Sequence, residues 1–158
     1  MKISDRGRLV PPSPIRKLVP FAEQAKADGV HVHHLNIGQP DVATPPVFLE
    51  AVAKFPERVV AYGHSAGFLE LREAMAAYYR RVGYDVQTEH VTVTTGGSEA
   101  ILFALMAICD PGDEVICFEP FYTNYNGFAV ASAVRLRPLR CDPDAGYHLP
   151  AREEIERA

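Results

Sequence analysis

The sequence lacks the features that mark secreted and membrane-embedded proteins. It contains no tryptophan and only three cysteines, Cys109, Cys117 and Cys141, which are widely spaced and form no C-x-x-C pair. An odd, scattered set of this kind is typical of reduced thiols. No apolar run approaches the length of a membrane span, and the first residues lack the apolar segment of a signal peptide. These absences predict a cytoplasmic protein.

The chain also has no basic run. Its 16 Lys and Arg against 20 Asp and Glu give a net charge of −4, so neither nucleic acid nor an anionic membrane is an expected partner. The standard nucleotide motifs are missing: there is no G-x-x-x-x-G-K-[ST], and no G-x-G-x-x-G follows a strand. A nucleotide-binding module is therefore disfavoured. With 158 residues, 47% of them hydrophobic, the chain is predicted to be one globular domain with a sizeable core.

One stretch, residues 90–101, stands out among what is present. Valines and threonines over 91–95 predict a strand, Gly96 and Gly97 end it, and Ser98 and Glu99 stand where a helix begins. Such a helix start directs unpaired N–H groups and the positive end of the helix dipole at one spot, and glycines let an anion approach the backbone. The alternative is an ordinary capped helix, with Ser98 or Thr95 satisfying the first amides.

The remaining pattern alternates helices with short strands, which predicts a mainly parallel α/β sheet. A proline-rich arm over 1–14 comes first. Helices are expected at 15–28 (irregular near Pro20 and stopped by Gly29), 45–56, 68–82, 98–108, 121–133 and 151–158, and strands at 30–37, 91–95, 114–118 and 134–139. The last helix ends without a cap, which favours a truncated chain.

Three further positions are candidates for function, each with a plainer alternative. Gly38 lies in the turn-forming string 36–41 and is either a site of close ligand approach or a simple turn glycine. Tyr62 lies in a loop, where packing is the common role. Tyr122 follows a predicted strand and, in helical geometry, lies about 100° from Phe121 and so off the apolar stripe. Ligands bind at that end of open α/β sheets, although packing would also explain Tyr122.

Histidines alternate at His31, His33 and His34. Alternating histidines can bind a metal, but no carboxylate or cysteine accompanies them at ligand spacing, so a plain strand is favoured and no metal site is predicted.

Four strings, in order, resemble one family: Asn36–Asp41 (NIGQPD), residues 62–74, Thr95–Ala100 (TGGSEA) and residues 111–125. Together they resemble the N-terminal part of the class I/II, fold-type I aminotransferases that use pyridoxal 5′-phosphate. The resemblance implies a three-layer α/β fold with the mainly parallel sheet of the large domain of these enzymes, incomplete here. Residues 1–45 would form the N-terminal arm and a small-domain segment, and residues 46–158 the first part of the large domain.

The resemblance also implies roles for the candidate residues. Gly97, Ser98 and Glu99 match the segment that holds the phosphate of the cofactor, and Tyr122 matches the aromatic residue that stacks on its pyridine ring.

Two candidates bear on the substrate and on assembly. Gly38 matches the glycine beside the α-carboxylate of the substrate. Tyr62 matches a tyrosine that reaches the cofactor phosphate of the other subunit, which implies a homodimer.

The implied reaction moves an amino group between an amino acid and a 2-oxo acid. It needs a Schiff-base lysine, an acid on the pyridine nitrogen and an arginine for the substrate carboxylate. None of Lys2, Lys17, Lys26 and Lys54 lies in a segment resembling the family's lysine loop, so the chain alone is predicted to be inactive. Two alternatives stay open: a C–S lyase or another lyase or decarboxylase of the same fold type, and a non-catalytic fragment that serves in folding or dimerisation.

Overall fold

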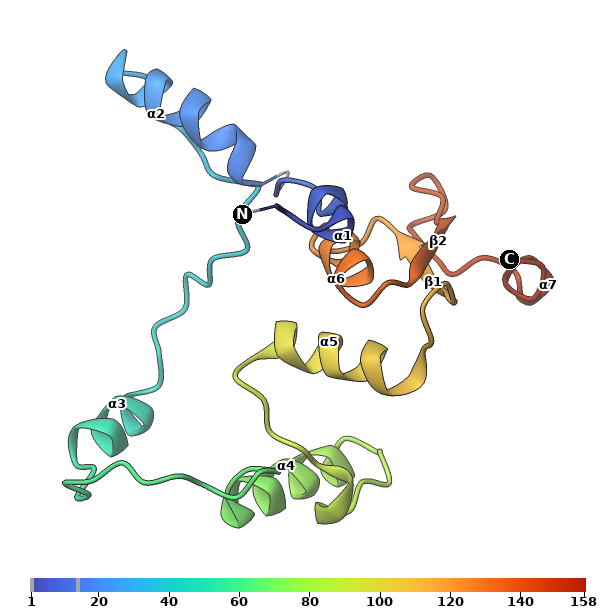
Figure 1. Cartoon of the computed structure of the whole chain (residues 1–158). Coiled ribbons are helices and arrows are strands. Elements are labelled where there is room, and N and C mark those ends of the chain that lie inside the picture. The colour runs from blue at the N-terminus through green and yellow to red at the C-terminus, as the bar shows by residue number, and fades with distance from the viewer. Residues whose placement is uncertain (1, 14) are drawn as a thin grey trace. The chain divides into compact units, whose positions relative to one another are not determined.

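The structure is a computed structural model that describes residues 2–13 and 15–158 (Figure 1). The contacts divide the chain into two compact units, Met1–Val19 with Thr94–Ala158 and Pro20–Val93. The chain passes between the units after Val19 and after Val93, and not at residue 45. The domain boundary at residue 45 stays a prediction.

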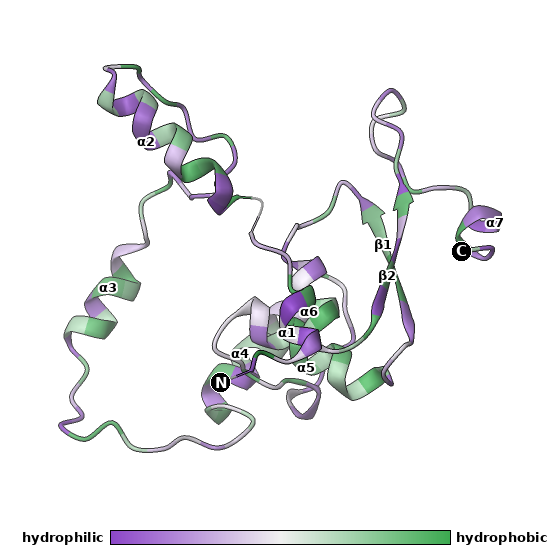
Figure 2. Ribbon diagram, turned by 45° about the horizontal axis from the view of Figure 1, so that its top comes forward, coloured by the Kyte–Doolittle hydropathy of each residue, from purple (hydrophilic) through white to green (hydrophobic). Residues whose placement is uncertain are grey.

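The first unit contains a two-stranded parallel sheet of β1 (Glu114–Glu119) and β2 (Arg135–Arg140), which lie side by side in Figure 2. Glu114 lies opposite Arg135. Helix α6 (Tyr125–Ala131) connects the strands, and α5 (Gly97–Ile108) precedes them. Parallel strands need such a crossover, so the predicted parallel strand–helix–strand arrangement is confirmed here.

The core of this unit lies between α5, α6 and the sheet. An apolar cavity of about 220 Å³ lies there, lined by Ile101, Ala104, Leu105, Val115, Ile116, Cys117, Tyr125, Phe128 and Leu136. Ile101 and Leu105 of α5 line this cavity, whereas Ile108 at the end of that helix is exposed. In the N-terminal arm, α1 (Asp5–Leu9) packs against α6.

The second unit is helical and irregular. The 3₁₀ turn Arg16–Leu18, in the first unit, leads into α2 (Val19–Ala27), so the irregular start predicted near Pro20 is found. Gly29, at φ 82°, ends α2 as expected. Helix α3 (Pro46–Ala53), α4 (Leu69–Arg81) and a 3₁₀ turn, Thr88–His90, follow.

Several predicted elements are wrong in extent. Residues 30–37 and 91–95 form no strand: Val91 has extended backbone, but a ladder needs a neighbouring strand, and the described residues supply none. Helix α6 begins at Tyr125 instead of Phe121, and the last helix is the short α7 (Arg152–Ile155).

The predicted sizeable core is not found either. Among the described residues, the buried apolar ones are Ala76, Val91, Cys117, Ala129, Val134 and Cys141. None of the described helices has the length and apolar character needed to cross a membrane.

Candidate functional site

The turn that begins α5 has an open glycine backbone. Gly96 is the N-cap residue and adopts φ 120° and ψ 173°, a conformation that favours glycine. A Cβ atom placed on Gly96 or Gly97 would meet no other atom within 4 Å. A ligand can therefore approach the main chain of both residues closely.

Three donors at this turn are unpaired within the described part of the chain. The N–H groups of Gly97, Ser98 and Glu99 donate to no acceptor among the described residues, and Ala100 is the first to bond, to the Gly96 carbonyl at 3.3 Å. No described side chain caps the helix, so the alternative in which Ser98 or Thr95 satisfies the first amides is wrong. The exposed Ser98 hydroxyl adds a fourth donor, and the helix dipole adds positive potential. The arrangement suits an anion such as a phosphate.

Two side chains hold this turn, and sequence analysis missed both roles. The Thr94 hydroxyl donates to the Gly96 carbonyl at 2.9 Å. The Thr95 N–H donates to the Glu99 carboxylate at 2.7 Å. An acidic residue at the third helical position commonly reaches back to an amide before the helix, and that signal could have predicted the bond of Glu99.

Tyr122 lies in the irregular segment between β1 and α6. Because this segment is not helical, the predicted 100° offset from Phe121 does not apply. Tyr122 is 49% exposed and its ring meets that of Tyr125 edge-on at 5.8 Å between centroids, while its hydroxyl accepts a hydrogen bond from Asn124 at 2.6 Å. Tyr125 in turn shares the apolar cavity with Ile101 in α5. Tyr122 is thus connected to α5 through Tyr125, and no described contact joins it directly to residues 97–99.

Gly38 and Tyr62 both belong to the second unit. Gly38 lies in irregular backbone, and a Cβ atom there would meet nothing within 4 Å. The Tyr62 side chain is fully exposed. No described contact joins the two residues.

Arg72 on α4 is a structural residue to which the sequence analysis assigned no role. Its guanidinium donates to the carbonyls of Val91 at 2.9 Å and Thr88 at 3.0 Å. The next bond along the chain joins the Val93 N–H to the Ala66 carbonyl at 2.9 Å. These three bonds hold the extended residues that precede the Thr94–Gly97 turn.

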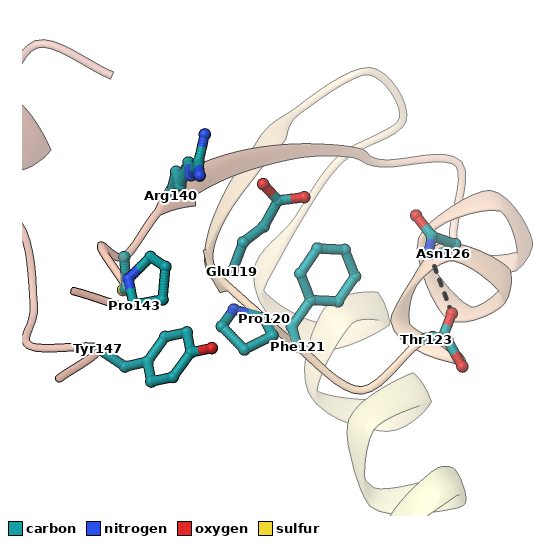
Figure 3. A pocket seen from close by; sticks show the side chains of 9 residues that line it. Glu119, Pro120, Phe121, Thr123, Asn126, Arg140, Pro143 and Tyr147 are labelled. Carbon is teal, nitrogen blue, oxygen red and sulfur yellow. Dashed lines mark hydrogen bonds between the residues drawn. The ribbon is translucent and has the colours of Figure 1, made fainter. Parts of the chain in front are cut away.

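A separate pocket of about 570 Å³ lies where β1 and β2 end (Figure 3). Glu119, Arg140 and Tyr147 are among its lining residues, whereas Tyr122 and residues 97–99 are not. This pocket is therefore separate from the glycine turn that begins α5.

Comparison with known proteins assigns the family. Residues 30–157 match the model of the family described as aminotransferase class I and II. The chain belongs to this family. It is 34% identical to the aspartate/prephenate aminotransferase of Thermus thermophilus over 99% of this chain and 41% of that protein. It is 39% identical to the aspartate aminotransferase of Thermotoga maritima over 75% of this chain and 33% of that protein.

Solved structures support the same assignment. The alanine aminotransferase of Pyrococcus furiosus superposes with a TM-score of 0.89 at 30% identity, over 99% of this chain and 40% of that one. The fold is therefore part of the α/β fold of these transferases, as the sequence predicted. The chain spans about two fifths of the length of the aminotransferases from Thermus thermophilus and Pyrococcus furiosus.

Proposed function

We propose that this chain binds the phosphate of pyridoxal 5′-phosphate at the start of α5, as the cofactor-binding part of an aminotransferase that acts on an amino acid and a 2-oxo acid. The observation that carries the proposal is the set of three unpaired N–H groups of Gly97, Ser98 and Glu99 at an open glycine turn. Family membership supports the identity of the anion.

The described residues fit this cofactor. The backbone donors and the Ser98 hydroxyl would hold the phosphate, and the half-exposed Tyr122 ring would cover one face of the pyridine. The cofactor supplies the electron sink for chemistry at the amino acid. The names of the relatives, aminotransferases of several kinds, favour amino-group transfer over the alternative lyase or decarboxylase reaction.

The proposal extends to the second unit and to assembly. Gly38, with open space around it, would lie beside the substrate carboxylate. The fully exposed Tyr62 would reach the cofactor phosphate of a partner subunit in a homodimer. The proposed location is the cytoplasm. Because Lys2, Lys17, Lys26 and Lys54 lie outside any segment like the family's lysine loop, we expect the chain to bind the cofactor without transferring amino groups.

The test is titration calorimetry of the 158-residue chain with pyridoxine 5′-phosphate and with pyridoxine, neither of which carries an aldehyde that could react with lysines. We expect the phosphorylated compound to bind at least about tenfold more tightly, because charge-assisted hydrogen bonds at a helix start recognise only that compound. Ser98→Ala should reduce this preference. Tyr122→Leu should weaken the binding of both compounds to the same degree, because the ring contact does not involve the phosphate.

Tyr147→Leu is the matched control, since Tyr147 is an exposed tyrosine that lines the other pocket. This variant should bind both compounds as the unmodified chain does. Loss of binding in Tyr147→Leu with full binding in Ser98→Ala and Tyr122→Leu would move the site to the pocket between the strand ends and refute the proposal.

A further inference from the structure

Glu99 contributes a side chain as well as an amide, and the two are used differently. Its N–H is one of the unpaired donors, whereas its carboxylate Oε2 accepts the Thr95 N–H at 2.7 Å. The side chain is half-buried, although residues 95–98 are exposed. The carboxylate therefore faces back across the turn, to the residue before the N-cap.

The turn has little else to define its shape. Gly96 and Gly97 have the greatest backbone freedom of any residue type, and Gly96 has no side chain with which to cap the helix. The other side-chain contact is the bond from the Thr94 hydroxyl to the Gly96 carbonyl. Glu99 closes the loop from Thr95 to the first turn of α5, which includes all three unpaired donors.

We propose that the Glu99 side chain is a positioning residue of the phosphate site. By accepting the Thr95 N–H, it holds the glycine turn in the shape in which the amides of residues 97–99 are presented together. This inference rests on the proposed function. The role requires a hydrogen-bond acceptor at the correct reach and does not require a negative charge, because a carboxylate beside a bound phosphate repels it.

Two substitutions separate reach from charge. Glu99→Gln keeps the length and an acceptor oxygen but removes the charge. Glu99→Asp keeps the charge but shortens the side chain by one methylene group, so that it no longer reaches Thr95. Aspartate is also favourable in the first turn of a helix, so folding should be preserved.

The measurement is the phosphate preference, defined as the ratio of the dissociation constants of pyridoxine and pyridoxine 5′-phosphate. In Glu99→Gln it should equal or exceed that of the unmodified chain. In Glu99→Asp it should fall about tenfold, the effect of a charge-assisted hydrogen bond, with the affinity for pyridoxine unchanged. A purely structural role would weaken both compounds alike. Glu70→Asp, in the first turn of α4 and without a described hydrogen bond, is the matched control and should change neither constant.

Three results would overturn the inference. The first is a Glu99→Asp variant that retains the phosphate preference. The second is a Glu99→Asp variant with an increased preference, which would make Glu99 a competitor of the phosphate. The third is a Glu99→Gln variant that loses the phosphate preference as Glu99→Asp does, which would make the charge essential. A lack of preference in the unmodified chain is a different failure, because it would refute the proposed function itself.

Discussion

Residues 97–140 and residues 30–68 are both rich in apolar side chains, yet only the first stretch buries them. In residues 97–140, two helices enclose one side of a parallel strand pair, and Cys117, Ala129 and Val134 are buried. In residues 30–68, Leu35, Val60 and Tyr62 are almost completely exposed. Apolar content alone therefore does not produce packing. Residues 97–140 include helices and strands that pack against one another, whereas residues 30–68 include no such pair of elements among the described residues.

The same contrast applies to the proposed site. The turn proposed to bind phosphate is defined by contacts within six residues, from Thr94 to Glu99. Gly38 and Tyr62, by comparison, have no described contact that positions them for a substrate or a phosphate. The following three experiments test this difference, from the largest expected effect to the smallest.

The largest effect is expected from Ala129→Asp. Ala129 is 3% exposed in α6, so the substitution buries an unpaired charge and should lower the free energy of unfolding of the first unit by about 3–5 kcal/mol. Hydrogen exchange should show loss of protection in β1 and β2, with protection in α4 retained. Ala131→Asp, on the exposed side of the same helix, is the control. Equal loss of protection in both units would show that they unfold together and would contradict the prediction.

Gly67→Ala tests the close approach of Gly67 to Val93, which lies beside the hydrogen bond from the Val93 N–H to the Ala66 carbonyl. Gly67 adopts φ 99°, and a Cβ atom there would lie 2.6 Å from the Cβ and Cγ2 atoms of Val93. Backbone strain and the clash together should lower the free energy of unfolding, measured by urea titration, by about 2–3 kcal/mol. Gly83→Ala isolates the strain, since Gly83 has φ 98° but open space, and should cost about 1–2 kcal/mol. Equal costs would show that the Val93 contact contributes nothing.

The smallest effect concerns Cys117 in the packed region. Burial, and secondarily the charge of Glu119, raise the pKa of this thiol above its ordinary value of 9.0. At pH 8, Cys117 should react with a thiol reagent about tenfold more slowly than the less buried Cys109. Between the pKa of the unfolded chain and the higher pKa of the folded chain, the Cys117 thiol keeps its proton in the folded chain and loses it in the unfolded chain. The associated stability is therefore complete below pH 9 and declines as the pH rises through the higher pKa of the folded state. Equal reaction rates would show that the packing around β1 opens readily.

Sequence reasoning predicted the elements whose signals are local. Helices α3 and α4 lie within a few residues of their predicted bounds, because prolines and glycines mark starts and ends and periodic apolar residues mark the bodies. The strand expected at 30–37 failed because β propensity favours an extended backbone but cannot supply a neighbouring strand.

The site follows the same division. Paired glycines before Ser98 predicted the glycine turn, because glycine conformation is a local property, but they did not decide between an open turn and one capped by Ser98 or Thr95. The bonds from Arg72 to the carbonyls of Val91 and Thr88 span 19 and 16 residues, and no local sequence pattern predicts bonds over that separation.

The turn at Gly96 presents main-chain donors, and that has a consequence for how such a site tolerates sequence change. Replacing a side chain leaves an N–H group in place, so most substitutions at positions 97 and 98 that preserve the turn would spare all three backbone donors. Proline is the exception, because it alone lacks the hydrogen. Substitutions could thus alter the surface chemistry of this loop widely while its main-chain donors persist.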